Sequence, residues 1–193
     1  MRVFYGFDAL PRFRRPAVTV GSFDGVHLGH RALLERLVGE ARRMNVESVV
    51  LTFEPHPRVT LGRDEGLRLL TTLEEKTALL AASGVDALVV IPFDRSFSTL
   101  SGAEFLDRYL VGKIGAETLV VGYNHRFGHD RADCRKLAEE RGLRLVCVDE
   151  RSVGGEHVSS TVIRNLLACG RQDEAERLAG HALRPGNESN DLP

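Results

Sequence analysis

The segment "TVGSFDGVHLGHRALLERL" (residues 19–37) leads from an apolar run through a glycine-containing polar loop into a helical pattern. A helix that begins near Leu28 would hold His27 and His30 at its first turn. Unpaired backbone N–H groups and the positive end of the helix dipole stabilise an anion at such a turn. The segment therefore predicts a strand, a helix, and a phosphate site between them.

Similar apolar runs, rich in β-branched residues, alternate with helical patterns along most of the chain. Runs this continuous are typical of strands buried on both faces of a parallel sheet. The predicted strands are residues 17–20, 47–53, 86–93, 117–123 and 143–148. Capping boxes at Thr72–Glu75 and Ser101–Glu104 mark the starts of two intervening helices. This alternation predicts an α/β fold with a doubly wound parallel sheet.

Length and composition narrow the class of protein. The chain has 193 residues and a formal net charge of −1, which predicts one domain over residues 1–183 and argues against a strongly basic nucleic-acid binder. We expect a disordered polar tail at 184–193 and an exposed basic segment, "PRFRRP" (11–16), before the first strand. No apolar run is long enough to span a membrane, and three scattered cysteines predict no disulfide framework. The expected location is the cytoplasm.

The loop of the opening segment is suited to phosphate because Gly21, Gly25 and Gly29 leave its backbone accessible. Two other interpretations apply to the histidine pair. One imidazole would cap the helix while the other lies on the surface, or the pair would bind zinc with His56 as a third ligand. The glycines and the preceding strand favour the phosphate site, and the incomplete ligand set argues against zinc. We therefore assign no metal ligand.

A second candidate phosphate site is "VSSTVIR" (158–164). Ser159, Ser160 and Thr161 combine hydroxyl groups with helix-start propensity, and Arg164 lies one turn further on, where its guanidinium can clamp a phosphate. Taken alone, the segment is equally an N-capped helix with a surface arginine. The sequence has no GxxxxGK[ST] loop, GxGxxG motif or GxSxG elbow, which disfavours P-loop kinases, dinucleotide-dependent dehydrogenases and α/β-hydrolases.

The pairing of "GSFDGVHLGH" (21–30) with "SSTVIR" (159–164) resembles the HxGH nucleotidyltransferase superfamily. Two middle motifs, "FEPHPR" (53–58) and "VVGYNHRFG" (120–128), are similar to those of the FMN adenylyltransferase module of bacterial bifunctional riboflavin kinase/FAD synthetases. The resemblance implies a Rossmann-like nucleotidyltransferase fold. It also implies the transfer of an adenylyl group from ATP to FMN, which yields FAD and pyrophosphate. Mg²⁺ would arrive on the ATP phosphates.

The resemblance also implies roles for particular residues. His27 and His30 would contact the ATP phosphates and supply positive charge together with Arg164 and Mg²⁺. The other nucleotide-binding positions are Gly21, Phe23, Asp24, Gly29, Ser159, Ser160 and Thr161. The flavin-binding positions are His56, Asn124 and Arg126. Asp24 would orient the loop or position Mg²⁺, and a turn-capping role is the alternative.

Departures from the family pattern leave other functions open. Asn124 and His125 stand where many relatives have an acidic residue and a phenylalanine, and "HDRADC" (129–134) replaces the usual "GRxGD". A different phosphorylated acceptor is therefore an alternative to FMN. The riboflavin kinase domain that follows residues 175–183 in the bifunctional family is expected to be absent, so a non-catalytic flavin-nucleotide binder is a further alternative. We expect ATP and FMN as partners, no nucleic acid or membrane, and make no prediction of oligomeric state.

Overall fold

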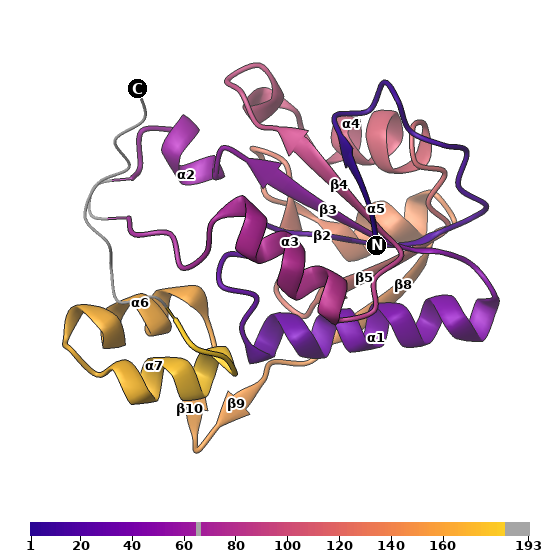
Figure 1. Ribbon diagram of the computed structural model, residues 1–193. Coiled ribbons are helices and arrows are strands. Elements are labelled where there is room, and N and C mark those ends of the chain that lie inside the picture. The colour runs from indigo at the N-terminus through magenta and orange to yellow at the C-terminus, as the bar shows by residue number, and fades with distance from the viewer. Residues whose placement is uncertain (65–66, 184–193) are drawn as a thin grey trace.

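The computed structural model describes residues 1–64 and 67–183. Within these ranges, the centre is a sheet of six parallel strands in the order β1-β4-β3-β2-β5-β8 (Figure 1). These strands are β1 Arg2–Tyr5, β2 Ala17–Val20, β3 Ser48–Glu54, β4 Ala87–Pro92, β5 Thr118–Gly122 and β8 Arg144–Val148. The predicted doubly wound parallel sheet and its predicted strands are confirmed. The predicted tail, 184–193, lies outside the described residues.

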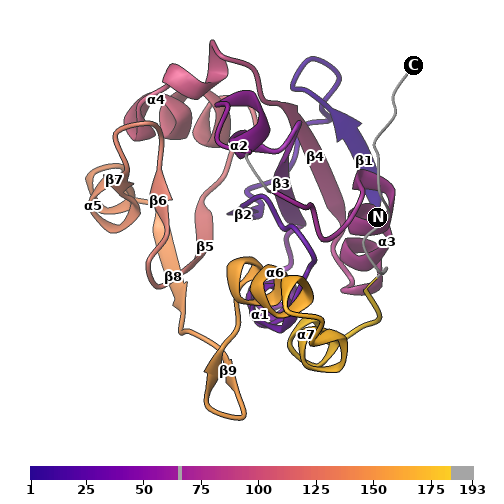
Figure 2. The ribbon, with the colours of Figure 1, turned by 90° about the vertical axis from the view of Figure 1, so that its left-hand side faces the viewer.

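Helices cover both faces of the sheet, with α1 and α3 on one side and α4 and α5 on the other (Figure 2). The helices are α1 Leu28–Met44, α2 Pro57–Thr60, α3 Leu73–Ala82, α4 Gly102–Phe105, α5 Cys134–Glu140, α6 Ser160–Ala168 and α7 Gln172–Ala179. A 3₁₀ turn, η1 Phe97–Thr99, and a π-helical segment, η2 Leu106–Val111, flank α4. Short hairpins pair β6 Arg126–Phe127 with β7 Ala132–Asp133, and β9 Ser152–Val153 with β10 Glu156–His157. Both predicted capping boxes are present.

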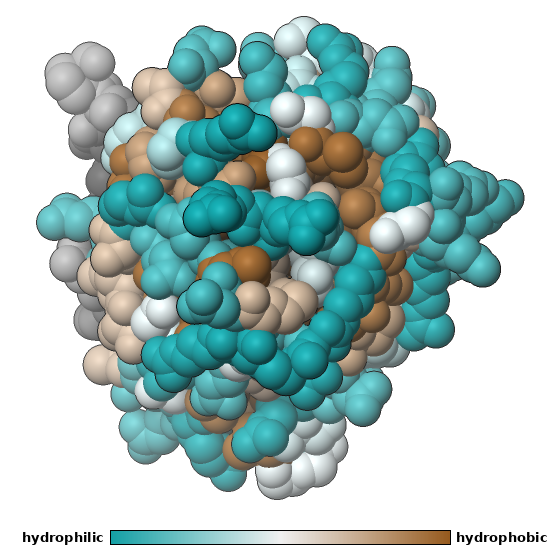
Figure 3. Space-filling view, turned by 90° about the vertical axis from the view of Figure 1, so that its right-hand side faces the viewer, coloured by the Kyte–Doolittle hydropathy of each residue, from teal (hydrophilic) through white to brown (hydrophobic). Residues whose placement is uncertain are grey.

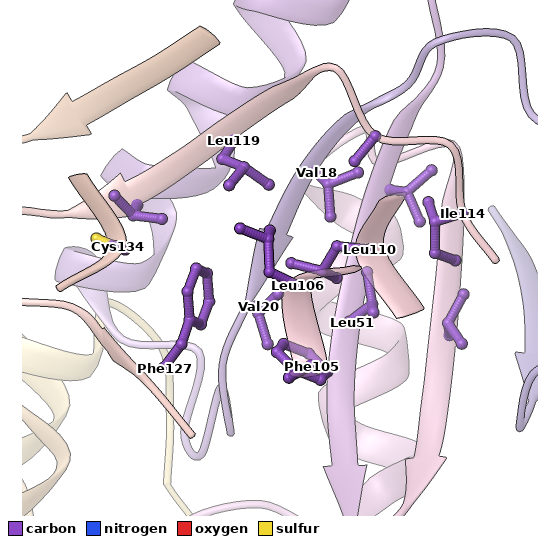
Figure 4. Packing of buried hydrophobic residues seen from close by; sticks show 14 of the residues in the cluster. Val18, Val20, Leu51, Phe105, Leu106, Leu110, Ile114, Leu119, Phe127 and Cys134 are labelled. Atoms are coloured by element: carbon purple, nitrogen blue, oxygen red, sulfur yellow. The ribbon is translucent and has the colours of Figure 1, made fainter. Parts of the chain in front are cut away.

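Alternating side chains of each strand enter two different hydrophobic layers. Val20 of β2 belongs to the layer under α4, η2 and α5, whereas Ala17 of the same strand belongs to the layer that contains Leu34 of α1. Figure 4 shows Val20 and Leu51 beside Leu106 in the first layer. Each fully buried side chain of this size stabilises the fold by about 1.5–3 kcal/mol. This two-sided burial explains why the strand sequences are apolar at nearly every position.

The N-terminal residues differ from the prediction of an exposed segment. β1 pairs in parallel with β4 over all four of its residues and adds an edge strand to the sheet. Within "PRFRRP" (11–16), the arginines are exposed, but Phe13 is buried and packs edge-on against Phe4 of β1. A four-residue strand carries too little periodicity to be recognised in isolation, because its ladder depends on the distant strand β4.

The strand order locates the site. From β2 the chain passes to β3 and β4 on one side of the sheet, then returns to β5 and β8 on the other, so the order reverses between β2 and β5. Ligands of open α/β sheets bind beyond the carboxyl ends of the strands at such a switch point.

α6 and α7 form a separate layer beside the start of α1 (Figures 1 and 2). The opposite end of the molecule presents a mainly hydrophilic surface (Figure 3).

Candidate active site

A cavity of about 390 Å³ lies at the switch point, and we call it the polar cavity. Its wall is formed by residues that follow β2, β5 and β8, by the first turn of α1, and by the segment that precedes α6. The predicted site residues that line it are Gly21, Phe23, His27, Gly29, His30, Asn124 and Ser159. The fold therefore brings the two predicted phosphate segments together, although about 130 residues separate them in sequence.

His27 is the N-cap of α1, and its ring is buried. Its Nδ1 accepts the backbone N–H of His30 at 3.3 Å, so the neutral ring carries its proton on Nε2. The two imidazoles stack with centroids 3.7 Å apart, and the ring of Phe23 lies 5.0 Å from that of His30. The capping interpretation is therefore confirmed for His27. The cap also orients the ring, and Nε2–H has no acceptor among the described residues, so it is available to a ligand.

Burial keeps both imidazoles neutral at pH 7. It lowers the pKa of His27 from 6.5 to about 4, with smaller effects from His157 and Arg164. Burial also lowers the pKa of His30 well below 6.5, and nearby His27 and Lys76 lower it further. The expectation that these two histidines supply positive charge is therefore wrong for the protein on its own. They are hydrogen-bond donors, and positive charge must come from other groups.

At two positions of the loop, the structure requires glycine for a steric reason. Gly25 has a φ of 80°, and a Cβ at this position would lie 2.7 Å from Cδ1 of Leu70. A Cβ at Gly29 would lie 3.2 Å from ring atoms of His27. A side chain at residue 25 would strain the backbone. One at residue 29 would displace the imidazole that faces the cavity.

Asp24 joins the loop to distant segments of the chain. Its Oδ1 accepts the backbone N–H groups of Leu70 at 2.8 Å and Thr71 at 3.3 Å, while Oδ2 forms an ion pair with Nη2 of Arg164 at 2.8 Å. Its backbone carbonyl accepts the hydroxyl of Ser160 at 2.9 Å. Asp24 is 1% exposed, so this network is shielded from water. The geometry supports a loop-orienting role, since both carboxylate oxygens are engaged by the protein.

The second predicted segment divides into residues that face the cavity and residues that hold the structure. Ser159 caps α6 and lines the polar cavity. The Ser160 hydroxyl is used by the loop, and Thr161 is exposed. Besides its ion pair, Arg164 donates Nε–H to the carbonyl of Arg68 at 2.9 Å. The guanidinium is thus held in place by protein groups at the edge of the site.

A second cavity, of about 400 Å³, opens beside the first and shares Val20 and His125 with it. We call it the aromatic cavity. The phenylalanines that line it are Phe53, Phe93, Phe97, Phe105 and Phe127, five of the nine in the chain. Neighbouring rings in this group have centroids 5.3 to 6.3 Å apart and mostly tilted or edge-on orientations. Arg63 and Arg126 add positive charge to its wall.

The three predicted flavin positions are placed differently. Arg126 lines the aromatic cavity, whereas Asn124 lines the polar cavity. His56 is buried and lines neither cavity. Its Nδ1 accepts the backbone N–H of Arg58 at 3.2 Å and thereby caps α2. Burial lowers the pKa of His56, and Asp24 partly offsets this effect. His125, between the cavities, has its pKa lowered to about 4 by burial.

Sequence reasoning missed several residues of the site. Tyr123, Glu150 and His157 line the polar cavity, and His157 is paired with Glu150. The phenylalanines of the aromatic cavity were also missed, although Phe53 near the end of β3 and Phe93 directly after β4 could have indicated them. His181 was also missed: its Nε2 lies 2.8 Å from the carbonyl oxygen of Gly25 and ties the chain after α7 to the loop.

The described residues do not provide a metal cage. Across residues 1–64 and 67–183, no group of three or more histidine, cysteine, aspartate or glutamate side chains is arranged to hold a metal ion. Asp24, the acidic residue within the loop at 21–30, is already bound by two N–H groups and a guanidinium. A divalent cation here would therefore need ligands from a bound substrate, such as phosphate oxygens.

Fold and site together define an α/β protein with a parallel sheet and a polar cavity at its switch point, beside the start of α1. The FAD synthetase family profile matches residues 11–162. The chain belongs to the FAD synthetase family.

Its relatives include the bifunctional riboflavin kinase/FMN adenylyltransferase of Escherichia coli K12, which is 38% identical over 168 residues. That alignment covers 85% of this chain and 54% of the relative, so the chain spans about half the length of such relatives. A relative from Geobacillus thermodenitrificans is 36% identical over 171 residues, which are 86% of this chain and 90% of that one.

Solved structures agree with the fold. The crystal structure of a macrolide-efflux protein from Streptococcus pneumoniae superposes with a TM-score of 0.84 at 25% identity, covering 94% of this chain and 60% of that one. Pantothenate synthetase from Thermus thermophilus superposes with a TM-score of 0.56 at 21% identity, over 93% of this chain and 81% of that one, and shares the fold. Over the described residues, none of the helices has the length and apolar character required to cross a membrane.

Proposed function

We propose that this chain transfers the adenylyl group of ATP to FMN and releases pyrophosphate. One observation carries the proposal: the first turn of α1 faces a polar cavity that shares a wall with an aromatic cavity. Two substrates that react through their phosphates need such adjoining cavities, because the reacting groups must meet at the shared boundary. The proposal covers residues 1–183 as the catalytic domain and includes the cytoplasm as its location.

ATP is assigned to the polar cavity. Its phosphates would accept hydrogen bonds from the backbone N–H groups of Leu28 and Gly29 at the start of α1, and from Nε2–H of His27. Ser159 lies across the cavity at the start of α6, a second helix terminus with the same polarity. Mg²⁺ enters with ATP as part of the substrate.

FMN is assigned to the aromatic cavity. The isoalloxazine ring is flat and largely apolar, and phenylalanine side chains on several sides offer stacking and edge contacts to such a ring. Arg126 and Arg63 at the wall offer donors to polar atoms of the flavin. This aromatic wall favours a flavin over an acceptor without a large flat ring.

The reaction needs no side-chain base. A phosphate oxygen of FMN is already an anion and attacks the α-phosphorus of ATP, forming the new P–O–P bond. The bond from the α-phosphorus to the bridging oxygen of the β-phosphate breaks, and its electrons leave with pyrophosphate. The protein therefore contributes by aligning the two phosphates and by donating hydrogen bonds where negative charge increases. His27 and His30 act as these neutral donors.

The proposal is tested with purified protein, MgATP and either FMN or riboflavin, with products separated by chromatography. FAD is expected from FMN, and none from riboflavin, because riboflavin has no phosphate to attack. Pyrophosphate release from a different phosphate ester, but not from FMN, would replace FMN as the acceptor. Tight FAD binding with no turnover at saturating substrates would instead indicate a non-catalytic binder.

A further inference from the structure

Lys76 is a buried cation that the reaction described above does not use. It lies on α3, one turn after the N-cap Thr72, and is 4% exposed. Among the described residues, its ammonium group makes no hydrogen bond and no ion pair within 4.0 Å. Buried lysines are rare unless they are paired. The burial of this one therefore needs an explanation.

The start of α3 is fixed against the phosphate loop. The Thr71 hydroxyl accepts the backbone N–H of Gly25 at 3.0 Å, and the Thr71 N–H group is donated to Asp24. The backbone N–H of Lys76 bonds the Thr72 carbonyl at 3.0 Å, so the lysine is anchored one turn from this junction. Lys76 is therefore attached to the same rigid assembly that positions the histidines.

Lys76 is not among the residues that line either cavity, but its charge acts on the pKa of His30. The pKa of His30 is lowered by burial first, then by His27 and Lys76. The pKa of His27 is lowered by burial, then by His157 and Arg164. Lys76 thus acts on the one imidazole and His157 on the other.

The charge of Lys76 is not balanced by an ion pair with any of the described residues. Both histidines are neutral at pH 7, and the charge of Arg164 is balanced by Asp24 at 2.8 Å. Burial lowers the pKa of Lys76, while Glu54 and Asp24 raise it in part. In addition, Nδ1 of His30 is buried without a hydrogen-bond partner among the described residues. An anion beside His30 would compensate the Lys76 ammonium better than the protein does.

We propose that Lys76 is a phosphate-binding residue of the reaction, and that its ammonium contacts the phosphate group that lies beside His30. This inference rests on the proposed function for the identity of the phosphate, which belongs either to ATP or to FMN. It explains why an unpaired cation is kept inside the fold: burial makes it costly without substrate and strong with substrate.

The test compares Lys76→Met, which keeps the length of the side chain, with Lys76→Arg, which keeps the charge. Lys113→Met is the matched control, because Lys113 is exposed. Titration calorimetry with inorganic pyrophosphate and with FMN shows which phosphate is contacted. We expect Lys76→Met to weaken the binding of either pyrophosphate or FMN by about tenfold or more. Lys76→Arg is expected to retain most of the affinity. Lys113→Met is expected to change neither.

Thermal unfolding separates binding from structure. Because Lys76→Met removes a buried unpaired charge, its Tm is expected to stay level or to rise, although ligand binding falls. Wild-type affinity of Lys76→Met for both pyrophosphate and FMN, in a protein of unchanged Tm, would overturn the proposal. A lower Tm with unchanged affinities would assign Lys76 a structural role instead.

NMR of the wild-type chain gives a readout that does not depend on any variant being folded. The sequence has three lysines, Lys76, Lys113 and Lys136, so ¹³Cε-labelled lysine gives a simple spectrum. Pyrophosphate or FMN is expected to shift the Lys76 signal and leave the other two. No shift of Lys76 with either probe would overturn the inference. If wild-type protein makes no FAD but its phosphate binding depends on Lys76, the proposed function fails and this inference holds.

Discussion

The polar cavity and the aromatic cavity share Val20 and His125 but are constructed in different ways. The polar cavity is held by hydrogen bonds and an ion pair that converge on one loop, whereas the aromatic cavity is held by ring packing between separate elements. Polar networks fix donors at defined points, and aromatic walls tolerate small shifts. The two constructions match two tasks, namely alignment of phosphates and capture of a flat ring.

The largest expected effect is on stability, at the centre of the polar network. Asp24→Ala leaves Arg164 without its ion-pair partner and two backbone N–H groups without an acceptor. We expect the free energy of unfolding to fall by about 3–5 kcal/mol, measured by denaturant titration. Asp24→Asn keeps an acceptor oxygen and is expected to lose less. A loss below about 1 kcal/mol for Asp24→Ala would mean that the network does not hold the loop.

Next in size is the chemical step. His30→Ala removes a neutral donor beside the reacting phosphates and is expected to lower kcat about 100-fold or more, by comparison with the loss of single oxyanion donors. The measurement is FAD formation at saturating MgATP and FMN. Circular dichroism and FAD binding serve as controls for folding. Wild-type kcat in a folded His30→Ala protein would remove His30 from the reaction.

The buried histidines predict a pH-dependent loss of stability. The pKa values of His27 and His125 are about 4 in the folded chain, against 6.5 for the ordinary side chain. Between pH 6.5 and about 4, the unfolded chain therefore binds more protons, and stability falls as pH falls. Each such group contributes about 1.4 kcal/mol per pH unit. The contribution of these two histidines to stability is fully present above pH 6.5.

Unfolding midpoints in urea between pH 7.5 and 5.0 measure this slope. His125→Phe removes one titrating group from the wall shared by the cavities and should make the slope shallower by about 1.4 kcal/mol per pH unit. A flat profile over this range in the wild-type chain would contradict neutral histidines. An unchanged slope in His125→Phe would show that His125 is accessible to protons in the folded chain.

The comparison of cavities also explains what the sequence could reveal. Sequence spacing predicted β2, β3, β4, β5 and β8, the start of α1 and both capping boxes, because each depends on a short segment. Part of the polar cavity was found for the same reason, since His27 and His30 lie in one motif. The aromatic cavity depends on rings from β3, β4, η1, α4 and β6, and no local spacing relates them.

Residue roles that depend on partners could not be predicted either. The sequence indicates that Arg164 is available to bind a phosphate, but its position in space is set by Asp24, 140 residues earlier. The neutral state of His27 and His30 depends on burial, which a motif does not report. Lys76 lies in a helical segment without a marked amphipathic pattern, and its burial follows from how α3 packs near the loop.

The smallest expected effect lies in the aromatic cavity and separates it from the polar one. Phe97 lies next to the rings of Phe53, Phe93 and Phe105, so Phe97→Ala removes one of several contacts to a flat ring. At about 0.5–1.5 kcal/mol for an aromatic pair, KM for FMN is expected to rise roughly twofold to tenfold, with KM for ATP and kcat nearly unchanged. Steady-state kinetics with each substrate varied in turn measures this split. A rise in KM for ATP of the same size would mean that the two cavities do not bind separate substrates.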